Sequence, residues 1–437
     1  MILENKKTAI INVNIFDGYN IIPATSVVIK GKTISQIGGK IPSDAQIIDA
    51  KGSTLLPGLM DAHVHTSLDS LAEAAKFGIT TELEMMGGFT EHGRNLQLNG
   101  KIGLADVRSA GMGLTAPGGH PDELMPSDKG GIPDFILKKM EKMSEEEKAA
   151  FIAAHEEDSH DEKTDLDTTT IEGAIQFVQK QVSHGADYIK IMIEEGSVLN
   201  APNLPLISED VMKAAVDEAH KHNKLVIAHI LTAEAAQTAV NIGVDGLAHL
   251  FIDRPEWTPG LIKQIAEKNI FVTPCLVLNS SILGHNACHI AHDARVIDKL
   301  EPQWKDTMCS CFNTFPEGNM QDNFDNVFDL YKAGVTILAG TDVSVPVPSL
   351  GGLAHGVSVH HEMQFLVQAG LTPIEALRCA TSNIASVFGL TDRGRIVEGA
   401  RADLLLVKGD PTKNISDTLS IESVWLNGSL QNNQKND

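Results

Sequence analysis

One stretch of sequence predicts the fold, Leu55-Leu56-Pro57-Gly58-Leu59-Met60-Asp61-Ala62-His63-Val64-His65. Its apolar run predicts a buried strand that ends in two histidines separated by one residue. Side chains two positions apart on a strand point to the same face, so His63 and His65 are expected to project into one space. Two imidazoles at the end of a buried strand suit a divalent metal such as zinc. For this short motif taken alone, a pair of core or surface histidines is the alternative.

The composition describes a soluble enzyme-sized protein. With 437 residues, of which 42% are hydrophobic and 21% charged, the chain predicts one large α/β domain and a smaller one. A net charge of -22 argues against a nucleic-acid-binding surface, which needs clustered Lys and Arg. The charged residues within 1–7 and the lack of an apolar run of about 18 residues favour a cytoplasmic protein without a membrane segment.

The five cysteines are sparse for a chain of this length, and we expect no disulfide framework. Cys309 and Cys311 could form a metal pair, but no second pair follows at zinc-finger spacing.

Both ends of the chain predict short strands separated by turns, at 9–13, 26–30 and 34–37 and again at 402–407 and 423–428. We therefore expect residues 1–57 and 397–437 to form one small β-sandwich domain that flanks the middle of the chain.

Residues 58–396 alternate short apolar strands with helical stretches, which is typical of parallel β/α units. Eight candidate strands fit a closed (β/α)8 barrel with insertions, and they lie at 55–65, 79–85, 103–109, 188–193, 225–230, 246–251, 271–276 and 336–342. A helix is expected over 208–219, where Ser208 suits the N-cap position.

Two insertions interrupt this rhythm and are expected to be long loops on the active-site side of the barrel. The insertion at 111–170 carries Gly118-Gly119-His120 and the acidic run 156–162. The insertion at 277–325 carries three histidines and two nearby cysteines, namely His285, His289, His292, Cys309 and Cys311.

Polar residues stand at or near the carboxyl ends of four predicted strands, where barrel enzymes build their sites. They are Lys190, His229, His249 and Asp342. Each has a structural alternative: Lys190 could pair with Glu194 or Glu195, the histidines could be core residues, and Asp342 could cap a helix. Together with His63 and His65 they form a coordination set that independent core roles would not produce.

In these motifs the sequence resembles the amidohydrolase superfamily of metal-dependent hydrolases, over nearly the whole chain. The segment 394–404 adds to the resemblance, and Gly118-Gly119-His120, 189–192 and 369–376 are most similar to its imidazolonepropionase-like and prolidase-like branch. The resemblance implies a distorted (β/α)8 barrel, an α/β fold, with a small β-sandwich domain formed from both chain ends.

The resemblance also implies the roles of the site residues. His63, His65 and Asp342 would bind one divalent metal, and His229 and His249 a second, with zinc as the first expectation. Lys190 would be carboxylated and bridge both metals. A water between the metals would become hydroxide, and Asp342 would act as general base and acid.

Substrate recognition rests on fewer residues. His120 resembles a loop histidine of the prolidase-like branch that contacts the substrate, with a turn histidine as its alternative. Glu194 and Glu195 depart from the small residues usual in that branch; they could favour a basic substrate group or pair with a Lys or Arg on a neighbouring loop. His360 and His361 are interpreted as structural residues of a helix.

The expected function is hydrolysis of a C–N bond in a small molecule, such as an Xaa-Pro dipeptide or an N-acyl amino acid. The alternatives are a mononuclear cyclic-amide hydrolase or deaminase and a non-catalytic barrel scaffold. A homo-oligomer is also expected.

Overall fold

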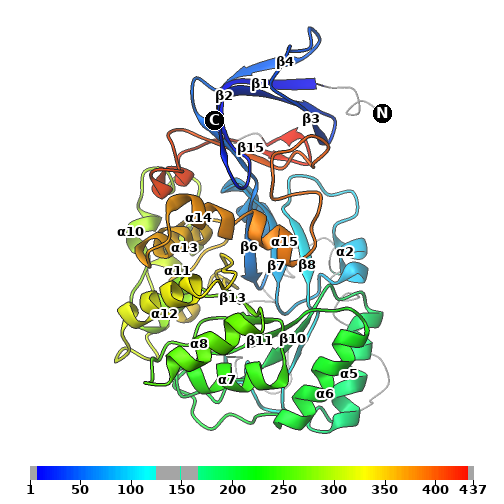
Figure 1. Ribbon diagram of the computed structural model, residues 1–437, viewed down its shortest axis with the longest axis vertical. Coiled ribbons are helices and arrows are strands. Elements are labelled where there is room, and N and C mark those ends of the chain that lie inside the picture. The colour runs from blue at the N-terminus through cyan, green and yellow to red at the C-terminus, as the bar shows by residue number, and fades with distance from the viewer. Residues whose placement is uncertain (1–6, 125–147, 149–165, 432–437) are drawn as a thin grey trace.

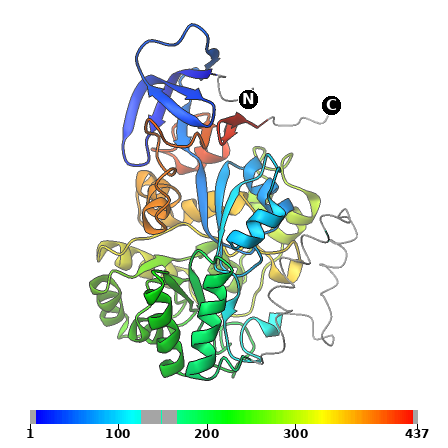
Figure 2. The same cartoon turned by 90° about the vertical axis from the view of Figure 1, so that its right-hand side faces the viewer.

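The computed structural model describes residues 7–124, 148 and 166–431. A β-sheet domain built from both ends of the chain lies at one end of an α/β barrel (Figure 1). The view turned by 90° shows the same separation, with the helices of the barrel arranged around its strands (Figure 2). The predicted fold class, a distorted barrel with a β domain from both chain ends, is confirmed.

The terminal domain is one eight-stranded sheet in the order β16-β15-β14-β5-β1-β2-β3, with β4 paired to β1. A bridge between Thr33 and Arg401 brings β3 back towards the start of β14, so the sheet folds over its own apolar core. Its strands are β1 (Lys7–Phe16), β2 (Ile21–Lys30), β3 (Thr33–Ile37), β4 (Gln46–Asp49), β5 (Thr54–Pro57), β14 (Leu404–Val407), β15 (Ile421–Leu426) and β16 (Ser429–Leu430).

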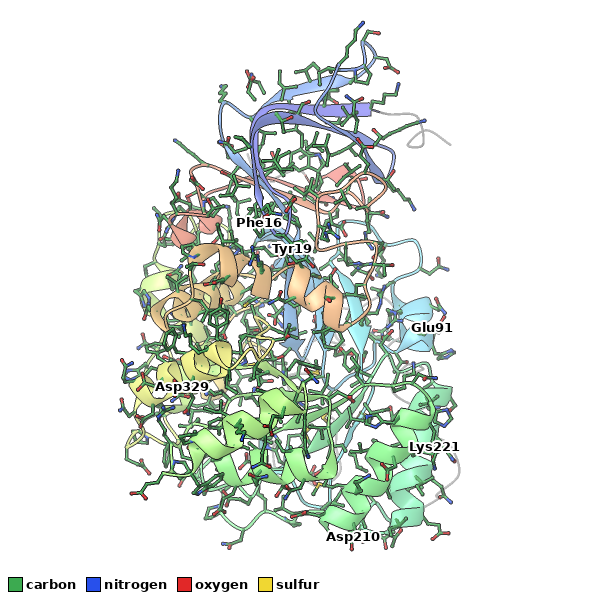
Figure 3. All side chains as sticks on the ribbon, in the orientation of Figure 1. Phe16, Tyr19, Glu91, Asp210, Lys221 and Asp329 are labelled. Atoms are coloured by element: carbon green, nitrogen blue, oxygen red, sulfur yellow. A yellow bond between two sulfur atoms is a disulfide. The ribbon has the colours of Figure 1, made fainter. Side chains whose placement is uncertain are left out.

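Strands β5 and β14 join the two domains because their alternate side chains enter different cores. Leu55 pairs with Leu406, and both point into the core of the sheet domain. Leu56 pairs with Leu405, and both belong to the large core of the barrel. Phe16 packs in that same large core, and it lies with Tyr19 where the two domains meet (Figure 3).

The predicted strand 55–65 is in fact two strands, β5 in the sheet domain and β6 in the barrel, and the prediction of one strand is wrong. Gly58 separates them. A Cβ atom at Gly58 would lie 2.2 Å from Oγ1 of Thr80, so only glycine lets the chain pass this close to the next barrel strand.

The barrel strands run parallel in two ladders, β6-β7-β8 and β9-β10-β11-β12-β13. β8 and β9 are consecutive pieces of the third strand: β8 pairs with β7, whereas β9 pairs with β10. These strands are β6 (Leu59–Val64), β7 (Ile79–Glu84), β8 (Asp106–Ser109), β9 (Gly113–Leu114), β10 (Ile189–Met192), β11 (Val226–His229), β12 (Gly246–Ala248) and β13 (Phe271–Thr273).

The eighth predicted strand, 336–342, closes the barrel without forming a regular strand. Ile337 bridges to Val272 of β13, and Val343 bridges to Val64 of β6. Backbone hydrogen bonds from Leu338 N to Val272 O and from Ala62 N to Ala339 O, both 2.9 Å, hold the segment between its neighbours.

Helices cover the outside of the barrel. The predicted helix after Ser208 is confirmed as α6, whose ends are marked by Asp210 and Lys221 in Figure 3, although the Ser208 side chain makes no capping hydrogen bond. None of the helices within the described residues is both long and apolar enough to cross a membrane. The helices are α1 (Leu68–Lys76), α2 (Glu91–Gln97), η1 (Asp122–Leu124), α5 (Ile171–Ser183), α6 (Glu209–Lys221), α7 (Ala233–Ile242), α8 (Thr258–Glu267), α9 (Leu276–Ile282), α10 (Cys288–Ala291), α11 (Pro302–Met308), α12 (Met320–Lys332), η2 (Pro348–Leu350), α13 (Val357–Gln368), α14 (Pro373–Cys379), α15 (Ser382–Val387) and η3 (Ile415–Leu419).

The second predicted insertion, 277–325, is a helical layer and not a long loop. It contains most of α9, all of α10 and α11 and the start of α12, packed around a separate apolar core that includes Ile282 and Trp304. A disulfide joins Cys288 to Cys309. This single disulfide was not predicted, and it forms because the layer brings α10 beside the end of α11. Cys311 is free. In the first insertion, the acidic run 156–162 lies outside the described residues.

Candidate metal centre

The alternation of strands β10 and β11 directs the predicted ligands into the barrel. Ile189 and Ile191 pack in the core between strands and helices, so Lys190, between them, points to the interior. Val226 and Ala228 pack in the same outer core, and His229 therefore faces inward as well.

Three predicted residues converge on one carboxylate. Nε2 of His63 lies 3.0 Å and Nε2 of His65 lies 3.1 Å from Oδ1 of Asp342, although His65 follows the last residue of β6. Nε2 of His249 lies 3.8 Å from the other oxygen, Oδ2. The ligand atoms of His63, His65 and Asp342 all lie within 4.8 Å of one another, a spacing that a single metal ion could span.

The backbone around Asp342 is constrained. Asp342 has a φ of 60°, a conformation that costs a non-glycine residue about 1–3 kcal/mol and is found at functional sites. Its N–H donates to the carbonyl of His63 at 2.8 Å. A Cβ atom at Gly340 would lie 3.0 Å from the backbone N of His63, so glycine allows this close approach.

The side chain of Asp61 hydrogen-bonds to the same two segments, the one that carries His63 and the one that carries Asp342. Its Oδ1 accepts hydrogen bonds from the backbone N–H groups of His63 and Thr341, both at 3.1 Å, and its Oδ2 accepts one from Oγ1 of Thr341 at 2.7 Å. Asp61 was not predicted as a site residue; the signal was a single carboxylate within the apolar run that precedes His63. The contacts of Asp61 therefore hold His63 and Asp342 close to each other.

His229 and His249 form the other half of the centre. Their ring centroids are 4.8 Å apart, and the ring of His249 stacks on that of His63 at 4.5 Å. Nε2 of His229 lies 3.2 Å from Oε2 of Glu194, and Oε1 of Glu194 accepts the Gly196 N–H at 2.7 Å. A carboxylate at one ring nitrogen fixes the ring orientation and leaves Nδ1 as the nitrogen available to a metal.

The carboxylates at 194 and 195 therefore do not behave as expected. Within the described residues, the side chain of Glu194 contacts His229 and Gly196, and the side chain of Glu195 bonds to Ser197. The expected ion pairs with Lys190 or with a Lys or Arg on a neighbouring loop are not found at either position among these contacts. The reason is local: the chain turns at Gly196 and folds both side chains back onto its own loop and onto β11.

Lys190 is 1% exposed, and its amine has no hydrogen-bond partner within the described residues. Burial lowers the pKa of this amine to about 8. A lone buried ammonium is costly. An amine of lowered pKa, beside four histidines and an aspartate, fits the chemistry of carboxylation to an anionic metal ligand.

Burial also keeps His63, His229 and His249 in the neutral form that binds metals. It lowers the pKa of His63 to about 3, and it brings the pKa values of His229 and His249 well below the ordinary range. Neutral imidazole is the ligand form. Nδ1 of His63 and Nδ1 of His249 are buried and lack partners within the described part of the chain. The donor set therefore fits a divalent metal.

The ring nitrogen of His65 that does not face Asp342 contacts a backbone carbonyl. Its Nδ1 lies 3.1 Å from the carbonyl of Met86. The next residue, Thr66, donates to Glu82, whose other oxygen lies 3.0 Å from Nδ1 of the fully buried His355. This chain of contacts orients the segment that carries His65.

His120 lies beside the second half of the centre. Its ring centroid is 4.3 Å from that of His229, and its Nδ1 lies 2.6 Å from Oε1 of Glu123. It is therefore not simply a turn histidine. By contrast, His360 bonds to the carbonyl of Phe77 at 2.9 Å and His361 packs on Phe365, so their interpretation as structural residues of α13 is consistent with their contacts.

Cys275 is a second site residue that was not predicted. It directly follows β13, is fully buried and has a ligand atom within 4.8 Å of ligand atoms of both His63 and His249. The only signal in the sequence was its position at the end of a predicted strand.

A cavity of about 510 Å³ opens on the same rim of the barrel. Ile193 and Glu195, which flank Glu194, line it together with Thr232, Asp253 and Trp257 from the loops after β11 and β12. Helices α6 and α7 line its other side, and none of the predicted metal ligands is among its lining residues.

The model of the amidohydrolase family matches residues 54–430. This chain belongs to the amidohydrolase family. The match covers the whole barrel and the C-terminal strands of the sheet domain, and it confirms the resemblance drawn from His63, His65, Lys190, His229, His249 and Asp342.

Relatives and solved structures agree with this assignment. The ochratoxinase of Aspergillus niger is 26% identical over 275 residues, which are 60% of this chain and about half, 49%, of that protein. A prolidase structure complexed with N-methylphosphonate-L-proline has a TM-score of 0.69 at 25% identity, covering 98% of this amidohydrolase and 99% of the prolidase. An Xaa-Pro dipeptidase with bound methionine has a TM-score of 0.69 at 23% identity, covering 98% and 100%, and supports the fold.

Proposed function

We propose that this amidohydrolase uses a binuclear metal centre to hydrolyse a C–N bond in a small molecule, with Xaa-Pro dipeptides and N-acyl amino acids as the leading substrate classes. The observation that carries the proposal is the convergence of His63, His65, His249 and Asp342 beside the amine of Lys190, which has no hydrogen-bond partner among the residues that the structure describes. The substrate classes are taken from the similarity to a prolidase and an ochratoxinase.

In this proposal the ligands divide into two groups. His63, His65 and Asp342 would hold one ion, His229 and His249 the other, and Lys190, carboxylated on its amine, would bridge them. Bound divalent ions supply Lewis acidity, which activates water near neutral pH and polarises a carbonyl. Zinc is the first candidate, because imidazole-rich sites suit it.

The side chains of the site then move the protons. Asp342, whose carboxylate lies at the meeting point of three histidines, would accept a proton from the attacking water. It would deliver that proton to the amine nitrogen as the C–N bond breaks. Burial raises the pKa of the Asp342 carboxyl, but its contacts with His249, His63 and His65 outweigh burial and hold that pKa well below the ordinary range.

His120 would orient the substrate. Glu123 occupies its Nδ1, so Nε2 is the nitrogen available to a substrate carbonyl or carboxylate oxygen.

The test combines metal content with a substrate panel. Protein purified without chelators should contain about two metals per chain by elemental analysis, and it should hydrolyse members of a panel of Xaa-Pro dipeptides and N-acyl amino acids. About one metal per chain together with turnover of cyclic amides or aminated bases would favour the mononuclear alternative. Protein that takes up no metal under any reconstitution would contradict both the binuclear and the mononuclear enzyme, and it would favour the alternative of a non-catalytic barrel scaffold.

A further inference from the structure

Cys275 lies at the carboxyl end of β13, on the rim of the barrel that carries the metal centre. Its side chain is 0% exposed, and its backbone has a φ of 49°, in the left-handed region that non-glycine residues rarely adopt. Such a conformation is strained and persists only where the surroundings enforce it.

The surroundings of Cys275 do enforce it. Glu362 of α13, itself fully buried, accepts hydrogen bonds from the backbone N–H groups of Leu276 at 3.0 Å and Val277 at 2.9 Å. The carbonyl of Cys275 accepts the N–H of Asn279 at 3.1 Å. Glu362, more than 80 residues away in the chain, and the first turn of α9 therefore hold the turn that carries the thiol.

The thiol borders both the apolar core around Ile282 and Trp304 and two histidines of the metal centre. The metal centre brings three ligand atoms within 4.8 Å of one another, one each from Cys275, His63 and His249, and all three side chains are buried. Nδ1 of His63, Nδ1 of His249 and Nζ of Lys190 are buried atoms without a hydrogen-bond partner in the described part of the chain. The thiol and one nitrogen from each of the two imidazoles therefore lie close enough together for a single ion to bind all three.

We propose that Cys275 is a sulfur ligand of the metal centre, binding the ion that His249 also binds and giving the site a preference for thiophilic ions such as zinc and cobalt over manganese. The proposal rests on the proposed metal-dependent function. On coordination the thiol loses its proton to solvent and the thiolate bonds to the ion. Thiolate ligands select zinc-like ions, whereas oxygen ligands alone suit manganese and magnesium.

Cobalt titration tests this directly, because a thiolate bound to Co²⁺ gives a charge-transfer absorption in the near ultraviolet that nitrogen and oxygen ligands do not give. Metal-free protein should develop this band as Co²⁺ is added, without reductant so that the Cys288–Cys309 disulfide stays closed. The Cys275→Ala variant should bind cobalt without the band. The matched control is Cys379→Ala, which removes another buried thiol, at the end of α14, and should keep the band.

A competition between Zn²⁺ and Mn²⁺ gives a second measurement. The preference of the protein for zinc should fall by at least about tenfold in Cys275→Ala and in Cys275→Ser, and stay unchanged in Cys379→Ala. The serine variant covers the case in which the alanine variant fails to fold.

The outcomes separate this proposal from the proposed function. Cobalt bound by the wild type without a charge-transfer band, or with a band that survives in Cys275→Ala, would overturn the role of Cys275 and leave the metal-dependent function intact. Protein that binds no cobalt or zinc would overturn both.

Discussion

The two halves of the centre are built in different ways. His63, His65 and Asp342 are brought together by two backbone segments that cross at short range, held by Asp61 and by the hydrogen bond from Asp342 N to His63 O. His229 and His249 come from the ends of two adjacent strands, and a side chain, Glu194, orients the first of them. The first half is therefore positioned by backbone hydrogen bonds together with the carboxylate of Asp61, whereas in the second half the carboxylate of Glu194 orients His229.

This difference decides where the site is sensitive. A substitution in the first half removes a group that makes several contacts within the site, so the loss of activity should be large. A substitution of the supporting carboxylate in the second half should weaken metal binding while the barrel stays folded, because His229 remains on a regular strand.

In the first half, the substitution Asp342→Asn should cause the largest loss of activity. It removes the proposed proton acceptor and weakens a metal ligand, and we expect a loss in kcat of at least about 10²–10⁴-fold. Steady-state kinetics on the best substrate of the panel measures the loss, and circular dichroism shows whether the fold is kept. A folded variant with a near-normal rate would remove Asp342 from the catalytic role.

Lys190→Ala addresses the group proposed to join the two halves. Without the bridging carbamate, the metal content should fall from about two ions per chain to one or fewer, and turnover should fall with it. Elemental analysis of the variant, purified alongside the wild type, gives the result. An unchanged metal content would contradict the bridged centre.

The buried amine also predicts a pH dependence in the metal-free protein. Burial lowers the pKa of Lys190 to about 8, whereas an unfolded lysine has a pKa near 10.5. Between about pH 8 and pH 10.5 the unfolded chain binds a proton at this position that the folded chain does not, so the contribution of Lys190 to the free energy of unfolding rises with pH across this window.

Lys190→Met removes that contribution, which amounts to about 3 kcal/mol at 1.4 kcal/mol per pKa unit. Urea unfolding should find the metal-free variant more stable than the metal-free wild type at pH 7, with the difference shrinking towards pH 10. A difference that is constant with pH would show that the amine does not titrate as a buried group.

Glu194→Gln tests the second half. Loss of the carboxylate at Nε2 of His229 should weaken binding of the second metal by about 10–100-fold and leave the first metal in place. Isothermal titration of metal-free protein separates the two binding events. The neighbouring Glu195→Gln is the matched control, because that side chain bonds to Ser197 and not to a histidine; equal losses in both variants would mean that overall charge, and not orientation of His229, sets the affinity.

The sequence predicted the parts of this site that depend on strand periodicity. Lys190 and His229 point inward because their neighbours Ile189, Ile191 and Ala228 are apolar and pack outward, a pattern that is visible in the sequence. The same rule explains why Leu55 and Leu56, adjacent in sequence, stabilise two different cores.

The parts that the sequence did not predict depend on contacts between distant residues. The left-handed backbone of Asp342 and that of Cys275 are imposed by hydrogen bonds to other segments, and no local pattern marks them. The same holds for Glu194, whose partner is 35 residues away in the chain. It also holds for the helical layer over 277–325, which is stabilised by its own apolar core.

The smallest expected effect separates support of the site from support of the fold. Thr341→Val deletes the hydroxyl that donates to Asp61, and Thr418→Val deletes a hydroxyl that donates to the carbonyl of Ile415 at 2.8 Å, far along the chain in η3. Both threonines are 0% exposed, so each substitution should lower the free energy of unfolding by about 1 kcal/mol. Only Thr341→Val should also weaken binding of the first metal, by a few-fold, because Asp61 positions His63 against Asp342. If metal titration finds equal affinities in the two variants, Asp61 stabilises the barrel alone, and the first half of the centre is held by its backbone hydrogen bonds without help from that carboxylate.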